Sequence, residues 1–299
     1  MRSLMKPLRS LLFVPGNKAA WMDKAPQYGA DALILDLEDS VPLADKATAR
    51  PLVRQAIERL AARGQTVYVR VNALETGMTG EDLDVIVGAG LTGLLPPKIE
   101  TPHDVHQLDT LLAYFERRRG LPPGSIELIP VLETARGIRQ AYDIACASPR
   151  VASIASGAGR GGDTNRSLGY VWTKEGMETL FIRSKVLLDA RAAGIAHPLV
   201  ASWFDVGDVD GFIADAQRNR QLGYRGMLLI HPSHVGPANQ IFTPSAEEVA
   251  YYKGLLAAME EAERQGTAAV TYQGAMVDIA MVKTAQQMLE FARAVGVQV

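Results

Sequence analysis

Eight short apolar runs separated by longer amphipathic segments recur along this chain, and this alternation restricts its fold more than any other feature. Short apolar runs bounded by turn-forming residues are typical of buried strands, whereas apolar residues three and four apart indicate helices. The apolar runs lie at residues 10–14, 32–37, 67–71, 93–98, 127–132, 151–156, 198–203 and 226–230. The helix-like segments lie at residues 18–28, 45–62, 81–87, 103–119, 136–147, 174–193 and 209–222. Eight strands alternating with helices predict an α/β fold, the (β/α)₈ TIM barrel.

The chain continues well beyond the eighth run. Residues 245–264 and about 276–295 have helical periodicity, and a minimal barrel does not require either segment. Residues 266–274 contain Gly, Thr, Tyr and Gln, and we interpret them as a hinge or crossing loop between these two helices. We therefore predict a barrel domain at 1–236 followed by a C-terminal helical extension at 237–299.

Composition excludes several classes of partner. The 31 Lys and Arg residues nearly balance the 33 Asp and Glu residues, so no bulk basic field is available for nucleic acid or an anionic membrane. No apolar stretch approaches the roughly 18 to 20 residues that cross a bilayer. Cys146 is the only cysteine, which excludes an intrachain disulfide, and we expect it to be a small buried hydrophobe. We expect a soluble, cytoplasmic protein.

Polar residues follow most of the predicted strands at the points where those strands end. In such barrels, the active site is built from the loops at the carboxyl ends of the strands. The polar residues at these positions are Asp36, Glu38, Asp39, Arg70, Asn72, Lys98, Glu133, Asp163 and His231. We therefore expect them to gather at one rim of the barrel.

Glu133 and Asp163 follow successive strands, so their carboxylates can meet at one point of that rim. Mg²⁺ takes oxygen ligands, commonly one or two protein carboxylates completed by water and substrate oxygens. Each carboxylate alone could instead cap a helix or pair with an arginine. The coincidence with Arg70 favours a metal site, in which the arginine would neutralise a substrate carboxylate.

A glycine-rich segment at residues 157–162 formally matches the G-x-G-x-x-G dinucleotide fingerprint. That fingerprint opens a helix near the first strand of its unit, whereas this segment follows the sixth strand and is followed at once by Asp163. We interpret the glycines as allowing close approach of backbone to a metal and ligand, with Arg160 and Arg166 available for anionic groups. Lys98 is open to two interpretations, a Schiff-base amine or an anion-binding group.

Several segments, in the same order nearly end to end, closely resemble the citrate lyase beta-subunit-like family of the HpcH/HpaI aldolase/citrate lyase superfamily. They are Arg9-Ser-Leu-Leu-Phe-Val-Pro-Gly-Asn17, Asp36-Leu-Glu-Asp39-Ser-Val, Val69-Arg-Val-Asn72, Pro97-Lys98, Glu133-Thr-Ala-Arg-Gly137, Asp163 with Gly169, Leu222-Gly-Tyr and Ile230-His-Pro232. The resemblance implies a (β/α)₈ barrel that binds Mg²⁺ and cleaves a carbon–carbon bond in a β-hydroxyacyl thioester, usually of coenzyme A.

The resemblance also assigns roles to residues of this chain. It implies that Glu133 and Asp163 are the metal ligands and that Arg70 binds substrate and takes part in catalysis. Further candidates for substrate binding are Glu38, Asp39, Lys98 and Arg160. Two departures leave substrate detail open. Many members place Gly-Gly-Glu-Asp before the second ligand where this chain has Gly161-Gly162, and a strand-seven Ile-Asp is replaced by Leu199-Val200-Ala201-Ser202.

One further match lies in the predicted extension, where Gln273-Gly-Ala-Met-Val-Asp278 resembles the segment that supplies the catalytic Asp in free-standing acyl-CoA lyases of the family. In those lyases the segment reaches the active site of a neighbouring subunit. The resemblance therefore implies that Asp278 is a general acid/base and that the chain is a homo-oligomer, a trimer or hexamer.

We expect a lyase that cleaves citramalyl-CoA or malyl-CoA into acetyl-CoA and pyruvate or glyoxylate. A first alternative is a citrate lyase beta subunit acting on citryl carried by an acyl carrier protein, and such subunits tend to be shorter at the C-terminus. A second is an aldolase acting on 2-oxo acids without a thioester. A third is a metal-binding barrel without turnover.

Overall fold

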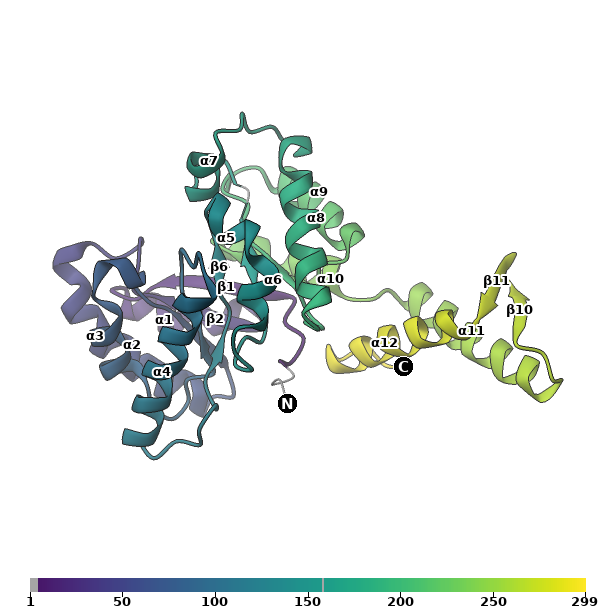
Figure 1. Cartoon of the computed structure of the whole chain (residues 1–299), viewed down its shortest axis with the longest axis horizontal. Coiled ribbons are helices and arrows are strands. Elements are labelled where there is room, and N and C mark those ends of the chain that lie inside the picture. Colours follow the sequence, from purple (N-terminus) through teal and green to yellow (C-terminus); the bar gives the residue numbers. More distant parts are fainter. Residues whose placement is uncertain (1–4, 158) are drawn as a thin grey trace. The chain divides into compact units, whose positions relative to one another are not determined.

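The computed structural model describes residues 5–157 and 159–299, and the chain divides into two compact units, Met1–Gln240 and Ile241–Val299. The first unit contains the alternating strands and helices, and the second contains the C-terminal elements (Figure 1). The boundary falls inside α10 (Val235–Phe242), as does the boundary predicted after residue 236.

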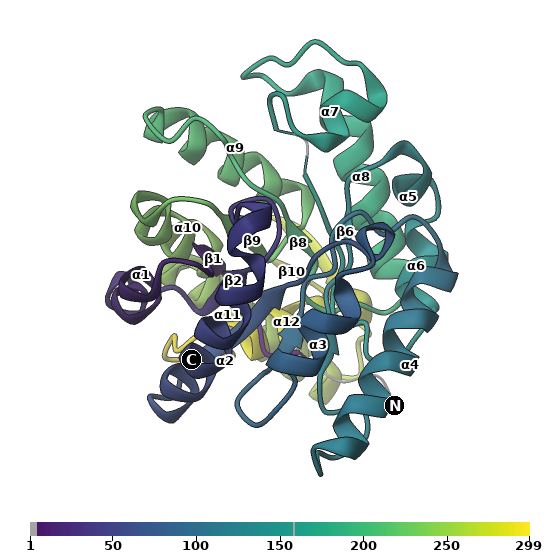
Figure 2. The same ribbon diagram turned by 90° about the vertical axis from the view of Figure 1, so that its left-hand side faces the viewer.

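Seven strands of the first unit form a parallel sheet in the order β5-β4-β3-β2-β1-β9-β8. They are β1 (Ser10–Pro15), β2 (Ala32–Asp36), β3 (Thr66–Arg70), β4 (Gly93–Leu94), β5 (Glu127–Leu128), β8 (Leu199–Val200) and β9 (Gly226–Leu229). A second parallel pair consists of β6 (Val131–Leu132) and β7 (Ala155–Ser156). Helices α1 to α10 surround these strands in Figure 2, and the α/β barrel prediction is confirmed.

The second pair fills the gap between the two ends of the seven-stranded sheet. The fifth predicted strand is split into β5 and β6 at Pro130, because proline has no N–H to donate to a ladder. Val151 bridges Leu128 of β5, and the backbone N–H of Ala201, after β8, donates to the carbonyl of Ser156 in β7 at 3.1 Å. These bonds close the sheet into an eight-stranded barrel.

The helices agree closely with the sequence periodicity. In the first unit they are α1 (Ala19–Lys24), α2 (Lys46–Ala62), α3 (Thr79–Ile86), α4 (Pro102–Arg118), α5 (Ala135–Arg139), α6 (Ala141–Cys146), α7 (Asp163–Leu168), α8 (Met177–Ala192), α9 (Val209–Leu222) and α10. Local signals explain their starts: Thr101 and Asp104 form a capping box at α4, and Asp208 caps α9. The short helices α7 and α10 were not predicted, because two turns carry too little periodicity to detect.

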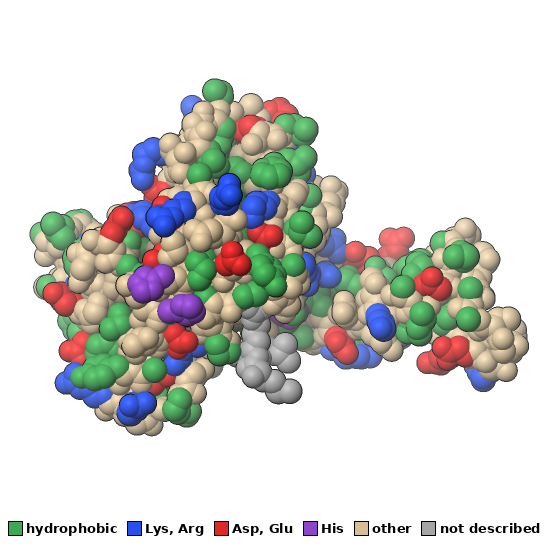
Figure 3. Space-filling view, viewed as in Figure 1, with side chains coloured by type: hydrophobic (Ala, Val, Ile, Leu, Met, Phe, Trp, Pro, Cys, Tyr) green, Lys and Arg blue, Asp and Glu red, His purple; other side chains and the backbone are tan. Residues whose placement is uncertain are grey.

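Surface properties agree with the composition. Acidic and basic side chains both occur across the face of the first unit shown in Figure 3. Within the described residues, no helix is long and apolar enough to span a bilayer. Cys146 is exposed rather than buried, so that expectation was wrong. The reason is its position on α6, where Ile144 and Ala145 take the buried face.

The second unit contains α11 (Ala246–Arg264), β10 (Ala269–Tyr272), β11 (Ala275–Asp278) and α12 (Ile279–Ala294). The predicted loop at 266–274 and the predicted helix start near 276 were wrong, because β10 and β11 form an antiparallel hairpin. Gln273 and Gly274 both have positive φ, 47° and 82°, as a two-residue type I′ hairpin turn requires. The helix begins only after Asp278, whose Oδ1 caps it by accepting from the N–H of Ala280 at 2.9 Å.

The backbone after β1 closely approaches the end of β2 at the rim of the barrel. Gly16 follows β1, and its N–H donates to the carbonyl of Asp36 at the end of β2 at 2.8 Å. A Cβ atom at this position would lie 2.5 Å from that carbonyl oxygen and 2.7 Å from a methyl group of Val53. The position therefore excludes any side chain.

Gly16→Ala is expected to lower stability by about 1 to 3 kcal/mol, because the added methyl group overpacks the contact between β1 and β2. The matched control is Gly80→Ala in α3, where no atom lies within 4 Å of an added Cβ and alanine favours the helix by about 0.5 to 1 kcal/mol. Chemical unfolding of both variants measures the difference. Equal stability of the two variants would contradict the close-approach argument.

Candidate active site

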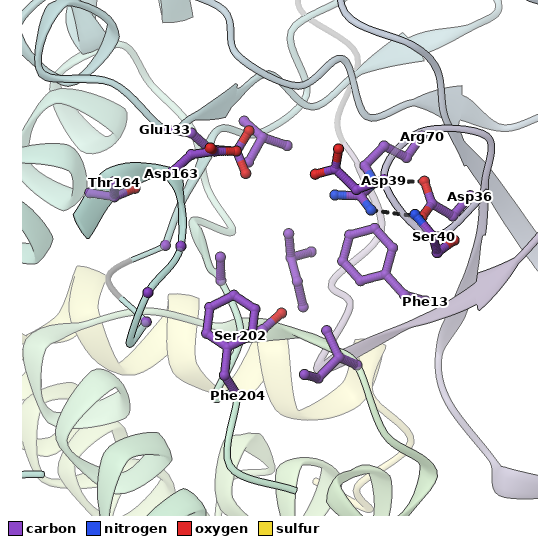
Figure 4. A pocket seen from close by; sticks show the side chains of 18 of the residues that line it. Phe13, Asp36, Asp39, Ser40, Arg70, Glu133, Asp163, Thr164, Ser202 and Phe204 are labelled. Atoms are coloured by element: carbon purple, nitrogen blue, oxygen red, sulfur yellow. Dashed lines mark hydrogen bonds and ion pairs between the residues drawn. The ribbon is translucent and has the colours of Figure 1, made fainter. Parts of the chain in front are cut away.

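A cavity of about 490 Å³ opens at the carboxyl ends of the barrel strands, where the sequence predicted the site. Five of the predicted site residues line it: Asp36, Asp39, Arg70, Glu133 and Asp163. Figure 4 shows Glu133 and Asp163 together on one side of this cavity and Arg70 with Asp36 on another. The barrel therefore brings together side chains that are more than a hundred residues apart in sequence.

Arg70 and Asp36 form a two-point ion pair between adjacent strands. They are register partners at the ends of β3 and β2, and the Nε and Nη2 atoms of Arg70 each donate to one carboxylate oxygen at 2.7 Å. The backbone N–H groups of Glu38 and Ser40 also donate to Asp36. Burial acts to raise the pKa of Asp36, but the charge of Arg70 and these hydrogen bonds outweigh it and lower the pKa.

Glu38 connects the two cations of the site. Lys98 Nζ donates to Glu38 Oε1 at 2.7 Å, and Arg70 Nη1 lies 3.1 Å from Glu38 Oε2 without hydrogen-bond geometry. Burial acts to lower the pKa of Lys98, but the bond to Glu38 and the nearby carboxylates outweigh it and raise the pKa. An amine that forms a Schiff base needs a lowered pKa, so the geometry favours the anion-binding interpretation of Lys98.

The carboxylates of Glu133 and Asp163 lie close together on one side of the cavity in Figure 4. Glu133 follows β6 and accepts a hydrogen bond from the backbone N–H of Lys98 at 3.2 Å. Burial, together with the charges of Glu38 and Asp163, raises its pKa to about 7 against the opposing effect of Arg70. Asp163 begins α7 and pairs with Arg166 at 2.5 Å. Lys98 Nζ lies 3.8 Å from Oδ2 of Asp163, the carboxylate oxygen that does not contact Arg166.

The donor set at these two carboxylates suits a hard divalent cation. In the described part of the chain, no Lys or Arg lies within ion-pair distance of Glu133, so its charge faces Asp163 with one backbone N–H as support. Among the residues that the structure describes, no group of three or more His, Cys, Asp or Glu side chains is arranged so that it could hold a metal ion. Mg²⁺ commonly uses only one or two protein carboxylates and keeps several waters, so two oxygen ligands fit it.

Other predicted residues lie further from this centre. Asp39 is exposed at the mouth of the cavity, with its carboxylate 3.8 Å from Lys98 Nζ. Arg160 is exposed on the glycine-rich loop and does not line the cavity. His231 is exposed and bonds to Ser233 through Nδ1. Asp278 lies in the second unit, at the junction of β11 and α12, and its catalytic role stays a prediction.

The apolar side of the cavity was not predicted from the sequence, because hydrophobic residues carry no chemical signature. It is lined by Phe13, Val131, Ala201, Phe204, Leu228 and Ile230. The glycine-rich loop is the one signal that could have pointed to it. A Cβ at Gly159 would lie 1.9 Å from the ring of Phe204, so this glycine accommodates an aromatic ring.

Comparison with known proteins identifies the family. A model of the HpcH/HpaI aldolase/citrate lyase family matches residues 9–232. The chain is 34% identical over 286 residues to citrate lyase subunit beta of Leuconostoc mesenteroides, covering 96% of this chain and 93% of that protein. It is 35% identical over 312 residues to an L-malyl-CoA/beta-methylmalyl-CoA lyase of Cereibacter sphaeroides, covering 97% and 96%.

A solved structure agrees with these matches. The CitE protein of Mycobacterium tuberculosis, in complex with magnesium, acetoacetate and coenzyme A, is 31% identical and superposes with a TM-score of 0.74. The match covers 95% of this chain and 97% of that one. Because the family model spans most of the chain and these relatives align along nearly its whole length, the chain belongs to the HpcH/HpaI aldolase/citrate lyase family, whose matched relatives are named lyases.

Proposed function

We propose that this protein is a Mg²⁺-dependent carbon–carbon lyase that cleaves a β-hydroxyacyl-CoA of the citramalyl-CoA or malyl-CoA type into acetyl-CoA and a 2-oxo acid. The observation that carries the proposal is the pairing of Glu133 with Asp163 in a cavity that Arg70 also lines, with Lys98 Nζ close by, 3.8 Å from the Asp163 carboxylate. The carboxylates suit a divalent cation, and the two cations suit the negative charge of the substrate. Relatives that are named malyl-CoA lyases, and a neighbour crystallised with magnesium and coenzyme A, support the same assignment.

A second candidate is a citrate lyase beta subunit that acts on citryl carried by an acyl carrier protein. Several matched relatives carry that name. The expectation that such subunits are shorter at the C-terminus does not distinguish the Leuconostoc protein, because the match covers 93% of it and 96% of this chain. Length therefore does not separate the two candidates, and the identity of the thioester carrier must be measured.

In the proposed mechanism, Glu133 and Asp163 hold the cation. The bound Mg²⁺ would supply Lewis-acid polarisation of the substrate hydroxyl and carboxylate oxygens. Arg70 already uses its Nε and Nη2 atoms on Asp36, so its Nη1 side offers the contact with substrate. Asp36 and Glu38 thereby act as positioning residues that hold the Arg70 guanidinium in one orientation.

The chemistry moves one proton and one electron pair. Asp278 of a neighbouring subunit, as a carboxylate, takes the proton of the substrate hydroxyl, the adjacent carbon–carbon bond breaks, and its electron pair passes to the thioester as an enolate. Arg70, in the lining of the cavity, and Lys98, beside Glu38 and Asp163, offset the negative charge, because charges interact strongly in a recessed site. Asp278 of a neighbouring subunit then protonates the enolate carbon to give acetyl-CoA. We place Asp39 and Arg160, both exposed near the rim, as contacts for the thioester carrier.

A substrate panel tests the function. Purified protein with Mg²⁺ is expected to release 2-oxo acid from citramalyl-CoA or malyl-CoA, to lose this activity with a chelator, and to recover it when Mg²⁺ is restored. The panel also contains citryl-CoA, citryl on acyl carrier protein, and free 4-hydroxy-2-oxo acids. Turnover of citryl on the carrier protein alone would support the citrate lyase candidate, and turnover of free acids alone would support an aldolase.

The raised pKa of Glu133 predicts a pH-dependent metal affinity. A carboxylate that binds Mg²⁺ must be charged, so protonation below a pKa of about 7 competes with the metal. The dissociation constant for Mg²⁺ is expected to rise about fivefold between pH 7 and pH 6 and to level off above pH 8. Calorimetric titration of Mg²⁺ at each pH measures it.

Two variants control this measurement. Glu133→Gln is expected to bind Mg²⁺ weakly, with no change in affinity between pH 6 and pH 8, because the titrating group is gone. Glu58→Gln removes a carboxylate from the exposed pair with Arg54 on α2 and is expected to behave as the unmodified protein. The same pH dependence in Glu133→Gln would assign the titration to another group.

Asp278→Asn is expected to lower kcat about 10²- to 10⁴-fold, because it removes the proposed general acid/base. Asparagine caps helices as well as aspartate does, so α12 is expected to remain folded and Mg²⁺ binding unchanged. Asp210→Asn, in the exposed first turn of α9, is the matched control.

Mixing experiments test whether Asp278 serves a neighbouring subunit. Asp278→Asn and Glu133→Gln proteins, each inactive alone, are dissociated and reassembled together. Mixed oligomers are expected to regain activity, since some sites then combine an intact Glu133 with an intact Asp278 from another chain. No recovery in verified mixed oligomers would place both groups in the same chain.

A further inference from the structure

The cavity has two chemically different sides. Charged side chains occupy one part of it, with Glu133 and Asp163 on one wall and Arg70 with Asp36 on another (Figure 4). Phe13 and Phe204 lie away from Glu133 and Asp163 in the same view. The apolar residues Phe13, Val131, Ala201, Phe204, Leu228 and Ile230, here called the apolar wall, form much of the remaining lining, which also includes the hydroxyl side chains of Ser40, Thr164 and Ser202.

The apolar wall is supported by the interior of the barrel. Val131 and Leu228 are buried members of its hydrophobic core, and Phe13 and Ala201 pack against the same cluster. These side chains come from strands that end at the cavity, so their positions are set by the barrel itself. The wall is a rigid surface, because closely packed cores change shape little when a ligand binds.

Phe204 is the part of the wall that loops hold in place. It follows β8 and is 47% exposed, and its ring occupies the space that a side chain at position 159 would need. The ring also lies 3.5 Å from the place that a Cβ at Gly162 would occupy. The absence of side chains at these two glycines therefore leaves the space in which this ring lines the cavity.

We infer that the apolar wall selects substrates whose hydroxyl-bearing carbon carries an alkyl group, so that the 2-oxo acid released is pyruvate or a longer homologue, with Phe204 as a specificity-determining residue. The inference rests on the proposed function and narrows its substrate class. Glyoxylate and oxaloacetate, whose precursors carry a hydrogen or a carboxymethyl group at that carbon, are excluded as preferred products.

The hydroxyl-bearing carbon of such a substrate has four substituents. Its carboxylate and hydroxyl oxygens face Glu133 and Asp163, and its CH₂–thioester arm must leave through the mouth of the cavity. The fourth substituent then faces the apolar wall. Cleavage leaves that substituent attached to the carbonyl carbon of the 2-oxo acid, while the CH₂ group becomes the methyl group of acetyl-CoA.

An alkyl substituent removes apolar surface from water at this wall, whereas hydrogen leaves the surface hydrated. A carboxymethyl substituent would place a charge there without a partner. Arg70 is the only cation among the described residues of the lining; its guanidinium lies 4.8 Å from the centroid of the Phe13 ring, and the proposed mechanism already uses it for the charge of the reacting part of the substrate, so a second carboxylate would have no cation of its own. One methylene group in such a pocket changes selectivity by about 10- to 200-fold.

The test compares kcat/KM for four CoA thioesters that carry hydrogen, methyl, ethyl or carboxymethyl at the hydroxyl-bearing carbon. We expect methyl and ethyl to exceed hydrogen by about tenfold or more. The carboxymethyl compound is expected to be the poorest substrate. Calorimetric titration of glyoxylate, pyruvate, 2-oxobutanoate and oxaloacetate, each with Mg²⁺, provides a readout that is independent of turnover.

Variants connect the preference to the wall. Phe204→Ala is expected to lose most of the preference for methyl over hydrogen and to gain activity on substituents longer than ethyl. Phe204→Leu keeps an apolar side chain and is expected to retain the preference, which guards against a folding defect in the alanine variant. Phe181→Ala, at an exposed position of α8 that does not line the cavity, is the matched control and is expected to change nothing.

The outcomes separate this inference from the proposed function. If the protein cleaves the thioesters but has its highest kcat/KM for the compound with hydrogen or carboxymethyl, the inference is overturned and the lyase assignment remains intact. An unchanged preference in Phe204→Ala would overturn the role of Phe204. Absence of thioester cleavage, with pyruvate and 2-oxobutanoate still bound more tightly than glyoxylate and oxaloacetate, would overturn the proposed function and support the apolar wall.

Discussion

The ion pair between Arg70 and Asp36 organises the mouth of this barrel. Removing two charges from water is costly, and the cost is offset only when the geometry is good and the remaining polar atoms are bonded. Here the two residues are register partners on adjacent strands, and two backbone N–H groups complete the bonding of the carboxylate. The pair holds the guanidinium beside Glu38, which in turn bonds to Lys98. The backbone of Lys98 then supports Glu133, so one buried pair positions the charged part of the site.

Much of this arrangement could be predicted because parallel strands end at a common edge. Eight apolar runs were enough to predict a barrel, and the position of Glu133 and Asp163 after successive runs was enough to predict their meeting. Strand lengths were harder to predict. The fourth run spans six residues in sequence but only Gly93–Leu94 in the sheet, because pairing depends on neighbouring strands as well as on local composition.

Features that depend on tertiary contacts could not be read from the chain. The hairpin of β10 and β11 resembled a loop followed by a helix, since only the positive φ angles at Gln273 and Gly274 reveal the turn. The ion pair between Arg70 and Asp36 could not be predicted, because it depends on the register between β2 and β3, which no sequence motif specifies. Phe204 escaped notice for a similar reason: its importance comes from the space left by Gly159, which is 45 residues earlier in the chain.

The contrast between the charged and apolar parts of the cavity suits the proposed cleavage of a CoA thioester. Breaking the carbon–carbon bond transfers negative charge from one end of the substrate toward the thioester, while the substituent on the hydroxyl-bearing carbon remains neutral throughout. Charged groups that are already fixed need not reorganise as that charge moves. Hydrocarbon beside them excludes water and strengthens their effect. A uniformly apolar cavity would not stabilise the charge, and a uniformly polar cavity would not recognise the neutral group. In this barrel, charged and apolar side chains at the ends of different strands provide the two functions separately.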